Sequence, residues 1–190
     1  MNVGILAIQG DYEAHAKMLE RLGVRPSFIR TSADLDGLDG VILPGGESTT
    51  QLKFLEDEGL GSSLRQAAAR GVAIFGTCAG AILLAREVRN PSQASLGLLD
   101  AAVSRNGYGR QLDSEVRFGD CKLSSEPLEM VFIRAPILDE LGTGVEVLAS
   151  SEGRPVMVQQ GRVLAATFHP ELTEDCTIHK YFLHLVASRS

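Results

Sequence analysis

The chain has 190 residues, of which 44% are hydrophobic and 22% are charged, and its formal net charge is −6. This length suits one well-cored domain, so we expect a single domain over residues 1–190. The negative balance gives no electrostatic attraction to nucleic acid or to an anionic membrane. No apolar run approaches the ~20 residues that span a bilayer. The first residues lack a basic segment before an apolar one, so we expect no secretory signal.

The use of cysteine indicates the compartment. The three cysteines, Cys78, Cys121 and Cys176, are odd in number and too few for a disulfide framework. We therefore expect a reducing, cytoplasmic location. Their spacing matches no zinc motif, and we expect neither a metal nor another cofactor.

Strand-like and helix-like segments alternate through the first half of the chain. Continuous apolar runs predict strands that are buried on both faces of a sheet, and a shorter strand is expected between the first two runs. The predicted strands are 3–8, 27–29, 40–43 and 72–75. Helical periodicity predicts three helices between these strands. The first helix begins after Asp11, which would cap it, and the other two span 49–58 and 61–69.

The second half of the chain has a different character. From residue 101 to 167 the segments are short and strand-like, and turn residues such as Asn106-Gly107 separate them. A helix over 176–187 closes the chain. We therefore predict an α/β fold: a single-domain, open, mostly parallel, flavodoxin-like sheet with helices on both faces and antiparallel additions in the second half.

Cys78 lies in the sequence Gly-Thr-Cys-Ala-Gly, between a predicted strand and the apolar, helix-like segment 81–85. A tight strand-to-helix turn exposes its central side chain at the carboxyl edge of the sheet, and flanking glycines relieve its strain. A thiol at a helix N-terminus is also favoured as the thiolate. A buried core position is the ordinary alternative, but it gains nothing from such a turn. We predict that Cys78 is a nucleophile and that Cys121 and Cys176, without flanking glycines, are structural.

Four histidines are candidates for the base that assists this nucleophile. His15 is expected on the first helix, and His179 and His184 on the last, where solvated or partly buried positions are usual. His169 instead follows a predicted strand and precedes proline, so it lies at the edge of the sheet where ligands bind. Glu171 could orient the imidazole of His169, with an exposed loop carboxylate as the alternative. Cysteine, histidine and carboxylate together predict nucleophilic acyl transfer.

Acyl transfer also needs hydrogen-bond donors for the developing oxyanion. The N–H of Ala79, directly after the nucleophile, is one candidate. The second donor would come from Gly45-Gly46, which follow the predicted strand 40–43. A glycine loop could instead cradle a phosphate. However, this loop lacks the Gly-Lys-Ser/Thr ending of a P-loop, so nucleotide binding is the less favoured alternative.

With these residues in place, the chain resembles the class I (triad) glutamine amidotransferases over essentially its whole length. The glycine-flanked cysteine and His-Pro-Glu at 169–171 are typical of that superfamily. Within it, the chain resembles the branch formed by the glutaminase subunits of pyridoxal 5′-phosphate synthase. The resemblance rests on segments 8–11, 43–50, 76–80, 105–111, 131–136 and 168–173. Those specific to the branch are Gly-Gly-Glu-Ser-Thr-Thr at 45–50, Tyr-Gly-Arg-Gln at 108–111 and Phe-Ile-Arg-Ala-Pro at 132–136.

The resemblance implies a triad of Cys78, His169 and Glu171, which releases ammonia from L-glutamine through a thioester. It also implies a set of glutamine-binding residues, in which an arginine holds the α-carboxylate of the substrate. These residues are Gly46, Glu47, Ser48, Arg105, Ile133 and Arg134. For the two arginines, a surface charge or a packing stem is the alternative.

The resemblance further implies a partner: the lyase subunit of pyridoxal 5′-phosphate synthase, in a large hetero-oligomer that receives the ammonia. Docking would then gate the glutaminase, with the Gly45-Gly46 peptide as the element that moves. Two alternatives stay open. A related cysteine hydrolase of γ-glutamyl or peptide substrates would have the same strand-to-helix turn (elbow) at its cysteine. Arg105 and the 46–48 loop disfavour this alternative. A non-catalytic regulatory subunit is disfavoured by the intact triad.

Overall fold

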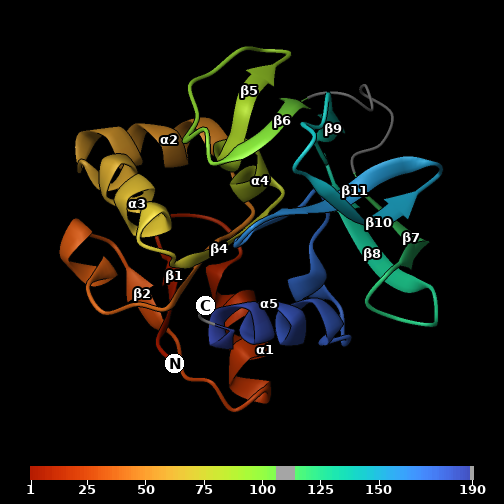
Figure 1. Cartoon of the computed structure of the whole chain (residues 1–190), viewed down its shortest axis with the longest axis horizontal. Helices are drawn as coiled ribbons and strands as arrows, with labels where there is room; N and C mark the ends of the chain where they lie inside the picture. Colours follow the sequence, from red (N-terminus) through yellow and green to blue (C-terminus); the bar gives the residue numbers. More distant parts are fainter. Residues whose placement is uncertain (106–113, 189–190) are drawn as a thin grey trace.

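The computed structural model describes residues 1–105 and 114–188 (Figure 1). Its main sheet has the strand order β2-β1-β3-β4-β12-β11-β10-β7-β8. The strands from β2 to β12 in this order pair in parallel. They are β1 (Val3–Leu6), β2 (Ser27–Ile29), β3 (Gly40–Leu43), β4 (Ala73–Thr77) and β12 (Val163–Ala166). This half of the sheet confirms the flavodoxin-like arrangement expected from the apolar runs.

The remaining strands of the main sheet are antiparallel additions, as predicted for the second half of the chain. They are β7 (Ser114–Cys121), β8 (Leu128–Ile133), β10 (Glu146–Ser151) and β11 (Arg154–Gln160). A second, three-stranded sheet has the order β5-β6-β9. Its strands are β5 (Ala85–Arg89), β6 (Leu99–Ser104) and β9 (Ile137–Asp139). We did not expect this small sheet from the sequence.

Helices cover both faces of the parallel strands (Figure 1). One face carries α2 (Ser48–Asp57), α3 (Leu60–Ala69) and α4 (Ala79–Leu84), and the other carries α1 (Tyr12–Arg21) and α5 (Thr177–Ala187). Each helix lies within two residues of its predicted bounds. Alternate residues of a strand enter different cores, because side chains alternate across a sheet. In β4, Ile74 packs toward α2 and α3, whereas Phe75 packs toward α1 and α5.

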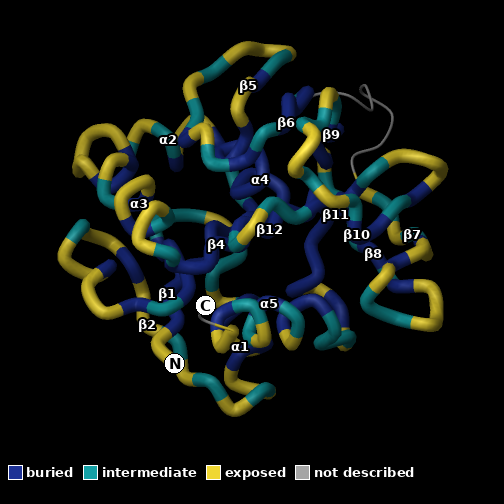
Figure 2. The backbone as a smooth tube through the Cα atoms, in the orientation of Figure 1, coloured by how far each residue is buried: buried dark blue, intermediate teal, exposed yellow. Residues whose placement is uncertain are grey.

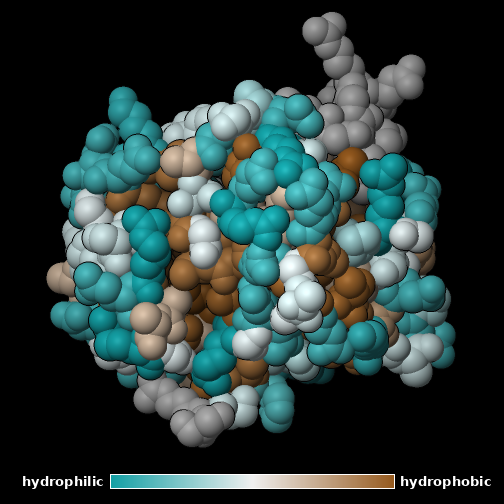
Figure 3. All heavy atoms as spheres, turned by 45° about the horizontal axis from the view of Figure 1, so that its top comes forward, coloured by the Kyte–Doolittle hydropathy of each residue, from teal (hydrophilic) through white to brown (hydrophobic). Residues whose placement is uncertain are grey.

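The central strands are the most deeply buried part of the molecule, as the dark blue segments of Figure 2 show. All residues of β1, β3, β4 and β12 are buried. On the face drawn in Figure 3, hydrophilic residues cover much of the surface, and apolar side chains are visible between them. Among the described residues, we find no helix with the length and apolar character needed to cross a membrane.

Candidate functional site

Cys78 occupies the sharp turn between β4 and α4. Its backbone angles, φ 47° and ψ −103°, are strained for a residue with a side chain. The glycines on both sides are sterically required: a Cβ at Gly80 would collide with the Leu43 carbonyl, and one at Gly76 would collide with the Gly80 backbone. The Cys78 N–H donates to the carbonyl of Ala166, 2.8 Å away, which ties the turn to β12. The sheet therefore holds this thiol in a fixed, strained position.

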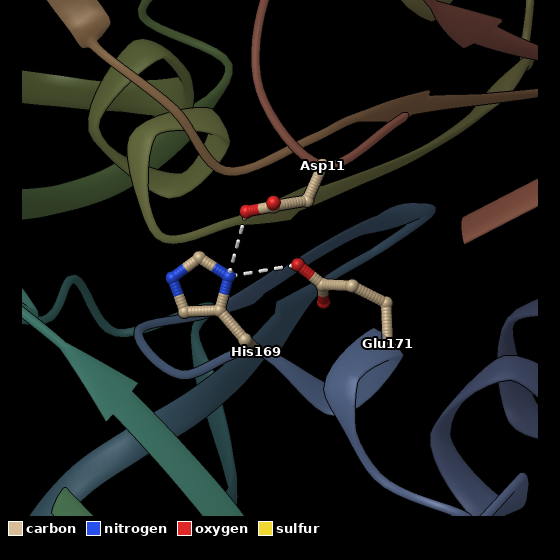
Figure 4. A group of neighbouring side chains, drawn as sticks. All are labelled: Asp11, His169 and Glu171. Carbon is tan, nitrogen blue, oxygen red and sulfur yellow. Dashed lines mark hydrogen bonds and ion pairs between the residues drawn. The ribbon is translucent and has the colours of Figure 1, made fainter. Parts of the chain in front are cut away.

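His169 lies three residues beyond the end of β12 and directly before the short 3-10 helix η3 (Pro170–Leu172). Its N–H donates to the carbonyl of Val131 in β8, at 2.8 Å. Its Nδ1 lies 2.8 Å from Oε1 of Glu171 (Figure 4), and both side chains are buried. The imidazole is thus oriented by a carboxylate from the same loop, as the sequence led us to expect.

A second carboxylate faces the same ring nitrogen. Oδ2 of Asp11 lies 3.4 Å from Nδ1 of His169, the nitrogen that also contacts Glu171 (Figure 4). Our prediction that Asp11 caps the first helix is wrong in this respect: Asp11 stands at the N-cap position of α1, but its side chain makes no cap hydrogen bond. The carboxylate is directed toward the imidazole instead, because a half-exposed anion gains more from a cation than from a helix end.

Ligand atoms of Asp11, His169 and Glu171 lie within 4.8 Å of one another, a spacing that could hold a metal ion. Hydrogen bonding already accounts for this spacing, and we assign the cluster to proton chemistry. Burial by itself lowers the pKa of His169, but interactions with Asp11, Cys78 and Glu171 outweigh burial and raise it. The hydrogen bond with His169 lowers the pKa of Asp11. The cluster therefore favours an imidazolium between two carboxylates.

Two further histidines lie next to the Asp11–His169–Glu171 cluster, on the side of Glu171. His15 and His179 are both completely buried, which corrects our expectation of solvated or partly buried positions. Nδ1 of His15 lies 2.9 Å from Nε2 of His179, and Nε2 of His15 lies 3.0 Å from Oγ1 of Thr77. The sequence holds a signal for this burial, since His15 is three residues before Met18 on the apolar stripe of α1. A histidine on such a stripe needs an internal hydrogen-bond partner.

The buried pair should make the fold sensitive to acid. Burial lowers the pKa of His15 and lowers that of His179 to about 3. Below the ordinary histidine pKa of ~6.5, the unfolded chain binds protons that the native chain does not. The free energy of unfolding should therefore fall between pH 6.5 and 5, by up to about 1.4 kcal/mol per pH unit for each buried histidine. His169, with its raised pKa, is protonated in the native chain throughout this range, so it adds a smaller slope of opposite sign near pH 6.5 that fades toward pH 5 as the unfolded chain becomes protonated too.

Urea unfolding at pH 6.5, 5.75 and 5 measures this slope. The variant His179→Gln should show a shallower decline than the unmodified protein. His184→Gln, on the exposed side of α5, is the matched control. Equal slopes for the unmodified protein and His179→Gln would contradict the assignment of acid sensitivity to the buried pair.

The glycine loop after β3 packs directly against His169. A Cβ at Gly45 would collide with the imidazole, and Gly46 has a φ of 147°, which suits glycine alone. The Gly45 N–H donates to Oγ1 of Thr77 at 3.1 Å, and the Gly45 carbonyl accepts from the Asp11 N–H at 3.2 Å. In this arrangement the Gly45 N–H is engaged by Thr77. Ala79, the other expected oxyanion donor, lies buried at the start of α4.

Two of the expected glutamine-binding residues contact each other. Nη2 of Arg105 lies 3.3 Å from Oε1 of Glu47. The Glu47 carboxylate also caps α2, accepting from the N–H and hydroxyl groups of Thr49 and Thr50. These hydrogen bonds, that of the Thr49 hydroxyl foremost, lower the pKa of Glu47 to about 2. The site thus holds an oriented carboxylate beside a guanidinium. Residues 106–111 of the expected 105–111 motif lie outside the described residues.

The other expected binding residues are arranged around Cys78 and the start of α2. Ser48 is buried, and its hydroxyl donates to Oε1 of Gln93 at 3.0 Å. The carbonyl of Ile133, at the end of β8, lies 3.8 Å from Sγ of Cys78. Arg134 follows with a φ of 43°, which is uncommon for a residue with a side chain. The unusual backbone of Arg134 thus turns the chain directly beside the thiol.

The fold and this geometry together define a class: an α/β protein with a cysteine at a strand-to-helix elbow, beside a buried histidine–glutamate pair. The family assignment follows from sequence. The chain belongs to the SNO glutamine amidotransferase family, whose model matches residues 5–188.

Curated relatives and solved structures match the chain over nearly its full length. The chain is 50% identical over 186 residues to "Pyridoxal 5′-phosphate synthase subunit PdxT" of Koribacter versatilis, covering 98% of this chain and 96% of that protein. It is 45% identical to the protein of the same name from Thermotoga neapolitana, covering 98% and 100%. A solved structure described as "Crystal structure of glutamine amidotransferase" has a TM-score of 0.93 and 46% identity, covering 98% and 100%.

Proposed function

We propose that this protein hydrolyses L-glutamine to L-glutamate and ammonia, and delivers the ammonia to a synthase subunit that makes pyridoxal 5′-phosphate, for vitamin B6 biosynthesis. The observation that carries the proposal is the position of Cys78 at a strained elbow beside the buried His169–Glu171 pair. Membership of the SNO glutamine amidotransferase family and the names of the curated relatives support the substrate and the pathway.

In the reaction we propose, the Cys78 thiolate attacks the side-chain carboxamide carbon of glutamine. Glu171 occupies Nδ1 of His169, which leaves Nε2 to exchange protons with the thiol and the leaving group. The tetrahedral intermediate collapses as the protonated imidazole transfers its proton to the departing ammonia, leaving a γ-glutamyl thioester. His169 then takes a proton from water, which hydrolyses the thioester to glutamate and regenerates the thiol.

The developing oxyanion needs two donors, and each is worth about 3 kcal/mol of transition-state stabilisation in comparable sites. We assign one to the N–H of Ala79 and the other to the Gly45-Gly46 loop. Thr77 already engages the Gly45 N–H, so Gly46 is the donor that we favour in this loop. The Gly45 carbonyl is bonded to Asp11, so rotation of the Gly45-Gly46 peptide would have to break that bond first.

For the substrate's own charges, we propose that Arg105 holds the α-carboxylate and that Glu47 receives the ammonium. The pair is only 3.3 Å apart and Arg105 is largely buried, so glutamine would be held by groups that are already oriented. Gly46, Ser48, Ile133 and Arg134 would complete the pocket, with Ile133 acting through its carbonyl beside Sγ of Cys78.

We propose a cytoplasmic location and a hetero-oligomer with the synthase subunit as the working form. Three cysteines without a disulfide among them suit a reducing compartment. Free ammonia would be protonated and lost in solvent, so hydrolysis should depend on docking. The two proteins together give a direct test of function and of gating.

Ammonia release from L-glutamine should be slow for this protein alone and at least about tenfold faster with the synthase subunit, because docking would complete the oxyanion site. A coupled glutamate dehydrogenase assay measures both rates. γ-Glutamyl dipeptides, assayed in parallel, should be poor substrates. Preference for the dipeptides would favour the alternative hydrolase, and absence of ammonia from the complex would overturn the proposal. Equal rates with and without the partner would overturn gating alone.

A further inference from the structure

The carboxylate of Glu171 has two oxygens, and only one of them contacts His169. The other, Oε2, lies 3.4 Å from Nε2 of His15 in α1, and both side chains are fully buried. Among the described residues, Oε2 has no hydrogen-bond partner of ordinary geometry, and Nε2 of His15 is the basic nitrogen recorded next to it. A buried carboxylate oxygen needs a donor, because an unsatisfied anion is costly away from water. His15 is placed to be that donor.

The surroundings of His15 define which ring nitrogen carries its proton. Burial lowers the pKa of His15, so the ring is neutral and has one N–H. The carboxylate of Glu171 can only accept, which places this proton on Nε2. Nδ1 of His15 must then accept the N–H of His179 Nε2, 2.9 Å away. His179 thus holds His15 in the tautomer that donates toward Glu171.

The same nitrogen of His15 also reaches Thr77, the residue before the nucleophile. Nε2 lies 3.0 Å from the Thr77 hydroxyl, which in turn accepts the N–H of Gly45 at 3.1 Å. A hydroxyl oxygen has two lone pairs, so it can accept from both groups at once. Thr77 is completely buried, as is His15. A continuous chain of buried contacts therefore joins Glu171 to the glycine loop.

We propose that His15 is a positioning residue, which fixes the far oxygen of Glu171 and, through Thr77, holds the Gly45-Gly46 loop beside Cys78. The inference rests on the glutaminase function proposed above. It connects the two halves of the catalytic machinery, the base and the oxyanion loop, through one imidazole that never touches substrate. Groups in one such network should not act independently.

The test is a double-mutant cycle on the complex with the synthase subunit, with L-glutamine as substrate. Thr77→Val removes the hydroxyl at nearly constant volume, and Thr77→Ser keeps it. We expect Thr77→Val to lower kcat about tenfold with KM within about twofold, and Thr77→Ser to stay within about threefold. His15→Leu should lower kcat about 10- to 100-fold, and His15→Gln, which restores a donor, should recover part of the loss. The exposed His184→Gln is the matched control.

The double variant His15→Leu/Thr77→Val should be about as slow as His15→Leu alone. The first substitution already disrupts the hydrogen-bond network, so the second has little left to remove. Multiplied losses would overturn the inference, as would equal kcat values for Thr77→Val and Thr77→Ser. Urea unfolding of every variant separates positioning from folding: losses of kcat that simply follow losses of stability would also overturn it. An unmodified complex that releases no ammonia would instead refute the proposed function.

Discussion

Replacing Cys78 with alanine should reduce ammonia release from glutamine by at least about 10³-fold in the complex with the synthase subunit. Loss of a nucleophile removes the covalent path entirely, whereas binding and the oxyanion donors leave only a small residual rate. The free energy of unfolding should change by no more than about 1 kcal/mol, because alanine meets the same backbone strain at φ 47° and only one atom is removed. Steady-state kinetics and urea unfolding measure the two quantities.

Cys176→Ala is the matched control for this prediction. Cys176 is free and only half-buried at the start of α5, so its loss should leave the rate within about twofold. A glutamine-like electrophile, such as a diazo-ketone analogue, should label the unmodified protein and Cys176→Ala but not Cys78→Ala. A Cys78→Ala variant that keeps a tenth of the rate would remove Cys78 from the mechanism.

The elbow could be predicted because its signal is local. The signal consists of two glycines, an apolar strand before them and an apolar helix after them, all within about fifteen residues. Each of these features can be read directly from the amino-acid sequence. The structure gives the physical reason: backbone atoms of Leu43 and Gly80 leave no room for a Cβ at Gly80 and Gly76. The parallel strands were predictable for a similar reason, since strands that are buried on both faces must be continuously apolar.

The β5-β6-β9 sheet was not predictable in the same way. β5 has the sequence Ala-Arg-Glu-Val-Arg, in which charged residues hide the apolar pattern, and it directly follows the apolar helix α4. Its strand character comes from pairing with β6 and not from its own sequence. Strand formation of this kind depends on a partner that the local sequence does not identify.

The surroundings of the His169–Glu171 pair also depend on long-range contacts. His15 and His179 are separated by 164 positions, and both were expected to be ordinary helical histidines. Only the packing of α1 beside α5 brings them together under Glu171. Asp11 was expected to cap a helix, because its position before α1 fits that role. The sequence could not show that His169, 158 residues later, offers the stronger partner.

Glu171→Gln should lower kcat on the order of 10³-fold, since a comparable carboxylate-to-amide change in a triad costs about 10⁴-fold. The amide oxygen must face the Nδ1–H of His169, so the amide NH₂ faces Nε2 of His15. His15 and His179 can shift their protons to accept this NH₂, which lets the variant fold. What cannot be restored is the negative charge that stabilises the His169 imidazolium.

Asp11 leaves one carboxylate beside the imidazole when Glu171 is replaced, because its Oδ2 lies 3.4 Å from Nδ1 of His169. Asp11→Asn alone should cost only a few-fold, since the Asp11 side chain is 39% exposed and water screens its charge. In the Glu171→Gln background the same change should cost about tenfold more, because the last anion beside the imidazole is then lost. If Asp11→Asn alone proves the more damaging single change, then Asp11, and not Glu171, is the carboxylate that orients the base.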